Sequence, residues 1–175
     1  MRVIAGRYGG RRLVAPPGRA TRPTSDRVRE ALFSILGPVE GAAVLDLFAG
    51  SGALGIEALS RGAARATFVD SGPRAVAAIR ANLESLGADA GVHRLDAAAF
   101  VGKASAAGDA YDLVFLDPPY REAAGLGRVI SLDPVLAPGA RVVAESDRRA
   151  PVELDLPLTD ERRYGDTLIR IHTLP

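Results

Sequence analysis

The chain of 175 residues has the size of one domain, and its content of 47% hydrophobic and 25% charged residues is typical of a globular protein. It contains no cysteine and only two histidines, which excludes disulfides and cysteine nucleophiles and argues against a metal site. No apolar run approaches the ~20 residues of a membrane span, and the first residues lack the apolar core of a signal peptide. We therefore expect a cytoplasmic protein, monomeric by default, with no membrane segment and no metal.

The net charge of +1 hides an asymmetry along the chain. Residues 1–30 contain eight arginines against two acids, a net charge of +6, so the remainder carries −5. A basic segment on a mildly acidic body indicates binding to a polyanion, although an ordinary solvated arm explains the charge equally well. We expect a basic extension over residues 1–22 and a main domain over 23–175. The arginines that would bind the polyanion are Arg2, Arg7, Arg11, Arg12, Arg19 and Arg22.

The N-terminal residues predict a β-hairpin over 2–15, with its turn at the glycines of "RYGG". A proline-rich, polar connection follows. Thr24 or Ser25 is placed to cap a helix that ends at Gly37-Pro38.

From residue 42 onward, apolar strand patterns alternate with helical patterns. The expected strands are 42–48, 65–70, 91–96, 111–117 and 140–146. The expected helices between them are 52–62, 73–87, 97–107 and 122–136. The final residues predict two strands joined by a turn near Tyr164-Gly165. This order predicts an α/β fold, with a mostly parallel seven-stranded sheet, helices on both faces and a C-terminal antiparallel hairpin.

Ligands of such sheets bind beyond the carboxyl ends of the strands, so the residues that follow each strand are the candidates. The first strand runs into "DLFAGSGALG", where Gly50, Gly52 and Gly55 have the G-x-G-x-x-G spacing that lets a backbone approach a ligand. Packing alone can also explain these glycines. Asp46 precedes the loop, and its carboxylate would repel a pyrophosphate. It suits instead a positively charged ligand, such as the ammonium and sulfonium groups of S-adenosylmethionine.

Two further acids close the next two strands. Asp70 lies 18 residues after Gly52 and can accept hydrogen bonds from both ribose hydroxyls of an adenosine. Asp96 can accept from an adenine amino group, while the backbone N–H of Ala97 donates to the ring. Both acids can also serve simply as helix caps. Together with Asp46 they are expected to line one rim of the sheet.

The fourth strand ends in Asp117-Pro118-Pro119-Tyr120. The prolines restrict the backbone and lack N–H groups, so the corner presents the Asp117 carboxylate and the Pro118 carbonyl as acceptors. Tyr120 adds a ring that can stack on a base. Such a corner can hold both protons of an exocyclic amino group and orient its lone pair toward an electrophile. A proline turn that merely ends the strand is the simpler alternative.

The stretches "VLDLFAGSGALGIEALSRGA", "FVDSGPRAVAAIRANL" and "YDLVFLDPPY" resemble class I S-adenosylmethionine-dependent methyltransferases with the (D/N)PPY motif of amino-group methylation. The resemblance implies their Rossmann-like fold. "RVIAGRYGGRRL", "RPTSDRVREALFSIL" and "RRYGDTLIRIH" further resemble the RsmD family of bacterial 16S ribosomal RNA guanine-N2 methyltransferases. The similarity covers essentially the whole chain. Glutamate is also common in such enzymes at the position of Asp70.

The resemblance implies S-adenosylmethionine as the cofactor and a guanosine of 16S rRNA, in the small ribosomal subunit, as the substrate. The implied cofactor-binding residues are Asp46, Phe48, Ala49, Gly50, Ser51, Gly52, Asp70, Ser71, Asp96 and Ala97. The implied catalytic residues are Asp117, Pro118, Pro119 and Tyr120, which would hold the guanine for direct in-line methyl transfer. Arg29 and Glu30 lie in a helix that we expect to cover the cofactor pocket, and neither is assigned a role.

Three alternatives remain open. A corner of this type serves any exocyclic amine, so methylation of adenine N6 or cytosine N4 in DNA or another RNA is possible, although no extra domain for reading DNA is evident. A nicotinamide-dependent oxidoreductase fits the glycine spacing but not Asp46 or the proline corner. A non-catalytic RNA-binding protein of the same fold would not need all four strand-end motifs.

Overall fold

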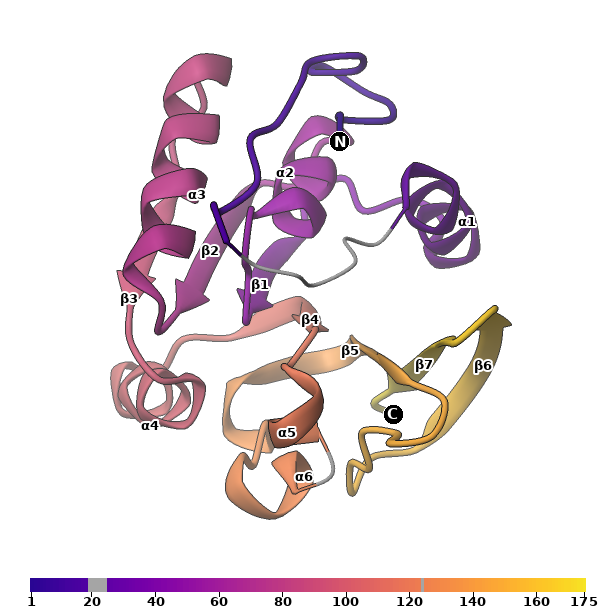
Figure 1. Ribbon diagram of the computed structural model, residues 1–175. Coiled ribbons are helices and arrows are strands. Elements are labelled where there is room, and N and C mark those ends of the chain that lie inside the picture. Colours follow the sequence, from indigo (N-terminus) through magenta and orange to yellow (C-terminus); the bar gives the residue numbers. More distant parts are fainter. Residues whose placement is uncertain (19–24, 124) are drawn as a thin grey trace.

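The computed structural model describes residues 1–18, 25–123 and 125–175, without the side chains of Tyr120 and Arg121. Its centre is a seven-stranded sheet in the order β3-β2-β1-β4-β5-β7-β6 (Figure 1). The strands are β1 Ala43–Leu47, β2 Arg65–Asp70, β3 Gly91–Arg94, β4 Tyr111–Leu116, β5 Leu136–Asp147, β6 Leu158–Tyr164 and β7 Thr167–Thr173. Neighbours among β1 to β5 are parallel, whereas β7 is antiparallel to β5 and β6. The predicted mostly parallel sheet with a C-terminal hairpin is confirmed.

The four longer helices begin and end close to the predicted residues. They are α1 Asp26–Leu36, α2 Ala53–Ser60, α3 Pro73–Leu86 and α4 Ala97–Ala107. Ser25 caps α1 by accepting a hydrogen bond from the backbone N–H of Val28, whereas the alternative cap, Thr24, lies outside the described residues. Gly87 and Gly108 end α3 and α4 in the left-handed conformation that glycine adopts without strain.

Helices α1, α2 and α3 cover one face of the sheet, and α4, α5 and α6 lie on the other (Figure 1). Successive residues of one strand therefore enter different cores. Val44 of β1 packs beneath α1 to α3, and its neighbour Leu45 packs on the opposite face. In β4, Phe115 likewise packs on the face covered by α1 to α3, and Leu116 packs on the opposite face. Because both faces are covered, the central strands are almost continuously apolar, and Asp46 is the exception in β1.

The single helix predicted over 122–136 is wrong. The chain instead forms α5 Tyr120–Ala123, α6 Leu126–Val129 and a 3-10 turn, η1 Asp133–Val135. Gly127 packs so closely on the segment after β5 that an added Cβ would lie 2.0 Å from the carbonyl oxygen of Glu153. This contact is tertiary and leaves no pattern in the local sequence. The following strand, β5, begins at residue 136, earlier than the predicted 140.

The predicted N-terminal hairpin is reduced to one antiparallel bridge, between Arg2 and Arg12, instead of two paired strands. The backbone N–H of Val3 donates to the carbonyl of Arg11, and that of Gly10 donates to the carbonyl of Val3. We call residues 1–15 the arm. Its turn lies at the predicted glycines, and its two halves run side by side without becoming regular strands.

The arm packs on α2 and belongs to the same core as the sheet. The core contains three side chains of the arm, Val3, Tyr8 and Leu13, which are buried. The backbone N–H groups of Ile4 and Ala5 donate to the carboxylate of Glu57, which has no exposed surface. The predicted boundary at residue 22 lies outside the described residues, so the division into an extension and a main domain stays a prediction.

Candidate active site

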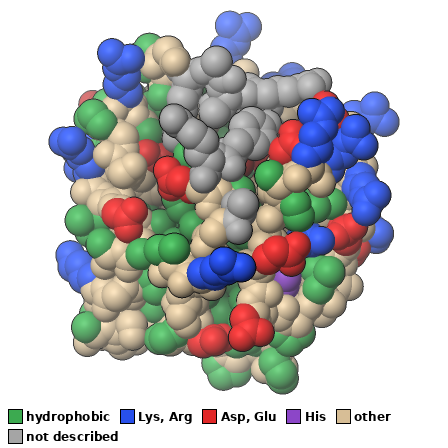
Figure 2. Space-filling view, turned by 60° about the horizontal axis from the view of Figure 1, so that its bottom comes forward, with side chains coloured by type: hydrophobic (Ala, Val, Ile, Leu, Met, Phe, Trp, Pro, Cys, Tyr) green, Lys and Arg blue, Asp and Glu red, His purple; other side chains and the backbone are tan. Residues whose placement is uncertain are grey.

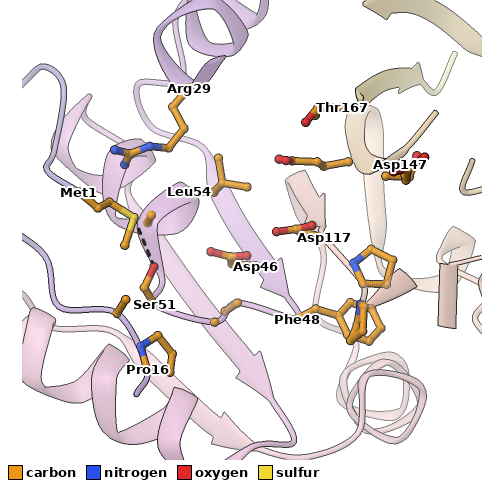
Figure 3. A pocket seen from close by; sticks show the side chains of 18 of the residues that line it. Met1, Pro16, Arg29, Asp46, Phe48, Ser51, Leu54, Asp117, Asp147 and Thr167 are labelled. Carbon is orange, nitrogen blue, oxygen red and sulfur yellow. Dashed lines mark hydrogen bonds between the residues drawn. The ribbon is translucent and has the colours of Figure 1, made fainter. Parts of the chain in front are cut away.

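A cavity of about 310 Å³ lies beyond the carboxyl ends of β1 and β4, at the rim where the sequence predicts ligand binding (Figure 3). Its described walls come from segments far apart in the chain. These are Met1 and Ala15 of the arm with the following Pro16, Arg29 of α1, Asp46 of β1, residues 48–51 with Ala53 and Leu54, the corner 117–119, and residues 145–147, 166 and 167 of the C-terminal strands and their turn.

The loop between β1 and α2 has an unusual backbone that brings it against the cavity. Phe48 has a φ of 61°, a left-handed conformation that costs a non-glycine residue about 1–3 kcal/mol and that often occurs at functional sites. Gly52 has a φ of 79° and begins α2. The third glycine, Gly55, is required by packing, because an added Cβ would lie 2.4 Å from the ring of Phe68. The packing explanation therefore accounts for Gly55, whereas residues 48–51 line the cavity.

Asp46 is buried at the end of β1, with 2% of its surface exposed, and it lines the cavity. One carboxyl oxygen accepts a hydrogen bond of 2.9 Å from the backbone N–H of Gly55. Burial raises the pKa of Asp46 to about 8; the hydrogen bond from Gly55 opposes this and the charge of Asp70 adds to it. A cation bound in the cavity would favour the ionised carboxylate, so the site suits the positively charged ligand predicted from the sequence.

Asp70 is buried next to the glycine loop but does not line the cavity. Its two carboxyl oxygens accept hydrogen bonds from the backbone N–H groups of Gly50 and Gly72, at 2.9 and 2.8 Å. It therefore connects the loops after β1 and β2, and the adjacent Ser71 is exposed. These positions are compatible with a ribose above the two loops, and that role stays a prediction.

Asp96 caps α4 in this structure. Its carboxylate accepts hydrogen bonds from the backbone N–H groups of Ala98 and Ala99, and its side chain is exposed outside the cavity. Ala97 is buried at the first position of the helix. Asp96 therefore acts as a helix cap, which is the alternative that the sequence left open. Because Asp96 does not line the cavity, its contact with adenine stays a prediction.

The corner after β4 reaches the same cavity as Asp46. Asp117, Pro118 and Pro119 all line it, and the Asp117 side chain is exposed to it (Figure 3). Leu47 of β1 lies opposite Leu116 of β4, which brings the two strand ends to the same level of the sheet. Tyr120 begins α5, but its side chain lies outside the described part of the structure.

The strand-end rule makes residues 145–147 at the carboxyl end of β5 candidates, but the sequence assigned no role to them or to the turn before β7. Leu116 pairs with Ala144, so Glu145 lies one residue beyond that pair, beside Asp117. Glu145 and Ser146 are buried and line the cavity, as do the exposed Asp166 and the half-buried Thr167. The turn before β7 lies within the stretch "RRYGDTLIRIH" that resembles the RsmD family, but the resemblance gave its residues no role.

Arg29 also lines the cavity, and the sequence gave it no role. Its guanidinium has no exposed surface, and its Nη2 donates to the carbonyl of Arg2 and, at 2.7 Å, to Asp26. Its Nε and Nη1 are buried and have no partner among the described residues. The expectation that this helix covers the pocket holds for Arg29, whereas Glu30 is exposed and does not line the cavity.

The predicted polyanion-binding arginines are spread over the arm. Arg2 pairs with Asp26, and Arg7 lies over the ring of Tyr8 at 4.5 Å. Arg11 donates to the carbonyl of Ser85 near the end of α3, and Arg12 is exposed. The remaining two, Arg19 and Arg22, lie outside the described residues. The backbone of Arg7 bonds to Ser60, so the turn of the arm lies at the far ends of α2 and α3 from the cavity.

The exposed arginines on the C-terminal side differ from those of the arm, because acids accompany them. Arg148 and Arg149 pair with Asp166, and Arg162 and Arg163 pair with neighbouring acids of β6. Figure 2 shows acidic and basic side chains intermixed on the face that it presents. Among the described residues of this side, the arginines are therefore largely accompanied by acids.

Within the described residues, no helix combines the length and apolarity needed to span a membrane. In those same ranges, no three histidine or acidic side chains gather where they could hold a metal ion.

The strand order, the glycine loop after β1 and the acids at the strand ends together define the class I methyltransferase fold. A family model described as "Conserved hypothetical protein 95" matches residues 1–173. The chain therefore belongs to this family, which is the RsmD family that its sequence resembles.

Curated relatives and solved structures agree with this assignment. The chain is 41% identical to "Putative rRNA methyltransferase YlbH" of Bacillus subtilis, over 98% of each chain. It is 45% identical to "Ribosomal RNA small subunit methyltransferase D" of Escherichia coli, over 69% of this chain and 61% of that protein. A solved structure, "Putative methyltransferase yhhF from Escherichia coli", superposes with a TM-score of 0.80 at 36% identity, covering 99% of this chain and 97% of the other.

Proposed function

We propose that this protein transfers a methyl group from S-adenosylmethionine to the exocyclic N2 amino group of a guanosine in 16S rRNA. The observation that carries the proposal is that Asp46 and the Asp117-Pro118-Pro119 corner line one cavity. The first suits a cation, and the second presents acceptors for an amino group. The family and the names of its rRNA-modifying relatives support RNA as the substrate class.

The residues around the glycine loop fit the cofactor. Asp46 would face the positive charges of the methionine part, and residues 48–51 would lie along it. Asp70 would accept from the ribose hydroxyls, and Asp96 with Ala97 would border the adenine. The cofactor supplies an electrophilic methyl group on a sulfonium. The protein holds that group still and close to the amine.

The corner would bind and orient the guanine. The Asp117 carboxylate and the Pro118 carbonyl accept the two amino protons, which turns the nitrogen lone pair toward the methyl group. The nitrogen becomes acidic only as its bond to carbon forms and the sulfur–carbon bond breaks, so Asp117 stabilises developing positive charge and need not be a strong base; the amino proton released can pass through its carboxylate to water. The transfer is direct, because the chain has no cysteine for a covalent intermediate on a base.

The substrate in this proposal is a loop guanosine of the small ribosomal subunit. A loop base can be splayed into a pocket at modest cost, and phosphate contacts from the arm would supply affinity and position. The protein would act as a monomer in the cytoplasm.

The test is transfer of tritiated methyl from S-adenosylmethionine to deproteinised 16S RNA, small ribosomal subunits and duplex DNA in parallel. Label in RNA or subunits, recovered as N2-methylguanosine at one position, is the expected result. Label recovered as N6-methyladenine or N4-methylcytosine would replace guanine N2 by the competing amine. Calorimetry with S-adenosylhomocysteine and with NAD tests the cofactor separately, and binding of NAD alone would overturn the methyltransferase assignment.

A further inference from the structure

Arg29 presents a buried positive charge with unused hydrogen-bonding capacity at the cavity wall. Its side chain has no exposed surface, and only Nη2 has partners, namely the Arg2 carbonyl and Asp26. Nε and Nη1 have none among the described residues. Buried donors without partners cost free energy, so such groups call for an explanation, often a missing ligand.

The environment indicates what that ligand group is. Arg29 and Asp46 line the same cavity, one from α1 and the other from β1 (Figure 3). A buried base and a buried acid in one pocket match a zwitterion, which carries a carboxylate and an ammonium a few bonds apart. The methionine part of S-adenosylmethionine is such a zwitterion. The N–H groups of a guanidinium form a planar fork that fits the two oxygens of a carboxylate.

We propose that Arg29 donates a hydrogen bond to the methionine carboxylate of S-adenosylmethionine from one of its unpartnered nitrogens, Nε or Nη1, which lie on different edges of the guanidinium. Asp26 and the Arg2 carbonyl hold Nη2 and so fix the plane of the guanidinium from outside the cavity. The inference rests on the proposed function and assigns one further cofactor-binding residue within it. A phosphate of the RNA is a poorer partner, because it brings no positive charge for Asp46 on the same cavity wall.

The test compares two ligands that differ only in the carboxylate, S-adenosylmethionine and its decarboxylated form, by calorimetry. Wild-type protein is expected to bind the carboxylate form about 10- to 100-fold more tightly, the range for hydrogen bonds to a charged group. Arg29→Met keeps the length of the side chain and removes the donors. It is expected to bind the two ligands within about 3-fold of each other, by losing affinity only for the first.

A control variant separates this role from a structural one. Arg61 also carries a guanidinium close to α1, over the ring of Phe33, but it pairs with Glu57 and does not line the cavity. Arg61→Met removes the same charge and is expected to keep the preference for the carboxylate form. Without ligand, Arg29→Met loses the ion pair with Asp26 and the hydrogen bond to the Arg2 carbonyl together with the two buried donors that lack a partner, so its melting curve serves to show that the variant is folded.

Each other outcome overturns a specific statement. If Arg29→Met loses affinity equally for both ligands, Arg29 shapes the pocket and does not bind the carboxylate. If the ligand preference is unchanged while RNA binding falls, the partner is a phosphate. If wild-type protein binds the two ligands equally well, the carboxylate has no anchor, although the proposed methyl transfer stands. If wild-type protein binds neither, the proposed function itself is wrong.

Discussion

Asp46 is a carboxylic acid in a position where its ionised form is poorly solvated. Burial raises its pKa to about 8, because a single backbone hydrogen bond does not replace the lost water. Near neutral pH and without a bound cation, the Asp46 carboxyl is therefore largely protonated, and a cationic ligand shifts it to the charged form. Burial of Asp46 therefore lowers the free energy of unfolding, and it also places a carboxylate where a ligand in the cavity can contact it.

Asp46→Asn tests this. An unfolded aspartate titrates near pH 4, so between about pH 4 and 8 the folded protein holds a proton that the unfolded chain has lost. The stability from this proton is complete at low pH and disappears as the pH rises through 8. The variant lacks the effect, so its stability relative to wild type should grow by about 2 kcal/mol from pH 6 to pH 9 in urea unfolding. A constant difference would contradict the raised pKa. Cofactor affinity should fall.

Asp117→Ala separates binding from chemistry. Asp117 lines the cavity at the corner and not at the glycine loop, so the variant should bind S-adenosylhomocysteine within about 3-fold of wild type. Methyl transfer to the RNA substrate should fall about 100-fold or more, because the amino group loses its orienting acceptor. Asp89→Ala, at an exposed position between α3 and β3, is the matched control and should keep full activity. Near-normal turnover of Asp117→Ala would remove Asp117 from the catalytic residues.

The sequence identified some of these residues and not others for a physical reason. Asp46 and Asp117 interrupt or end apolar strands, where a carboxylate is conspicuous in a linear pattern. Arg29 lies on a helix with several charged residues, and only the packing of α1 shows that it is buried. Burial of one side chain is set by contacts from distant segments, which periodicity does not report.

At the scale of elements, the helices show the same difference between features marked by the local sequence and features set by distant contacts. Helix α4 has its predicted bounds, and local residues account for both, because Asp96 caps its start and Gly108 ends it. The segment 122–136 is not the single helix that we predicted. The close contact of Gly127 with residue 153 interrupts it, and that contact depends on the path of the chain after β5.

Two glycine-to-alanine substitutions should have opposite effects. Gly127→Ala places a Cβ 2.0 Å from the Glu153 carbonyl oxygen, so we expect a loss of about 1–3 kcal/mol in the free energy of unfolding. Gly102→Ala lies within α4 with nothing within 4 Å of its added Cβ, so we expect a gain of about 0.5–1 kcal/mol. Urea unfolding measures both, and a gain for Gly127→Ala would show that the segment after β5 is free to move away.

At the scale of the whole molecule, the proposed contact of the arm with RNA predicts the size of the RNA that the protein needs. Its turn lies against Ser60 and Ser85, at the ends of α2 and α3 that face away from the cavity. These helices have 8 and 14 residues and are therefore about 12 and 20 Å long. An RNA that fills the cavity and also contacts Arg11 must extend along the molecule by about that distance, so a short oligonucleotide should not reach both.

Charge reversal tests the role of the arm. The double variant Arg11→Glu, Arg12→Glu should weaken binding to 16S RNA and lower the slope of log affinity against log salt by about 1–2. Binding of S-adenosylhomocysteine should be unchanged. Arg11→Lys with Arg12→Lys keeps the charges and should keep the salt slope, which controls for changes in shape. An unaltered RNA affinity across a salt titration would leave the arm without this role.

The cavity wall has a consequence for how the protein acquires activity during synthesis. It is assembled from Met1 of the arm, Asp46 and Asp117 in the middle of the chain, and Thr167 of the last strand. The backbone of Ile4 bonds to Glu57, more than fifty residues later, so the arm docks only after α2 exists. No partial chain released before β7 can close this wall. Tight cofactor binding is thus expected only once β7 has joined the sheet, and the cofactor then stabilises that fold over forms in which the wall is open.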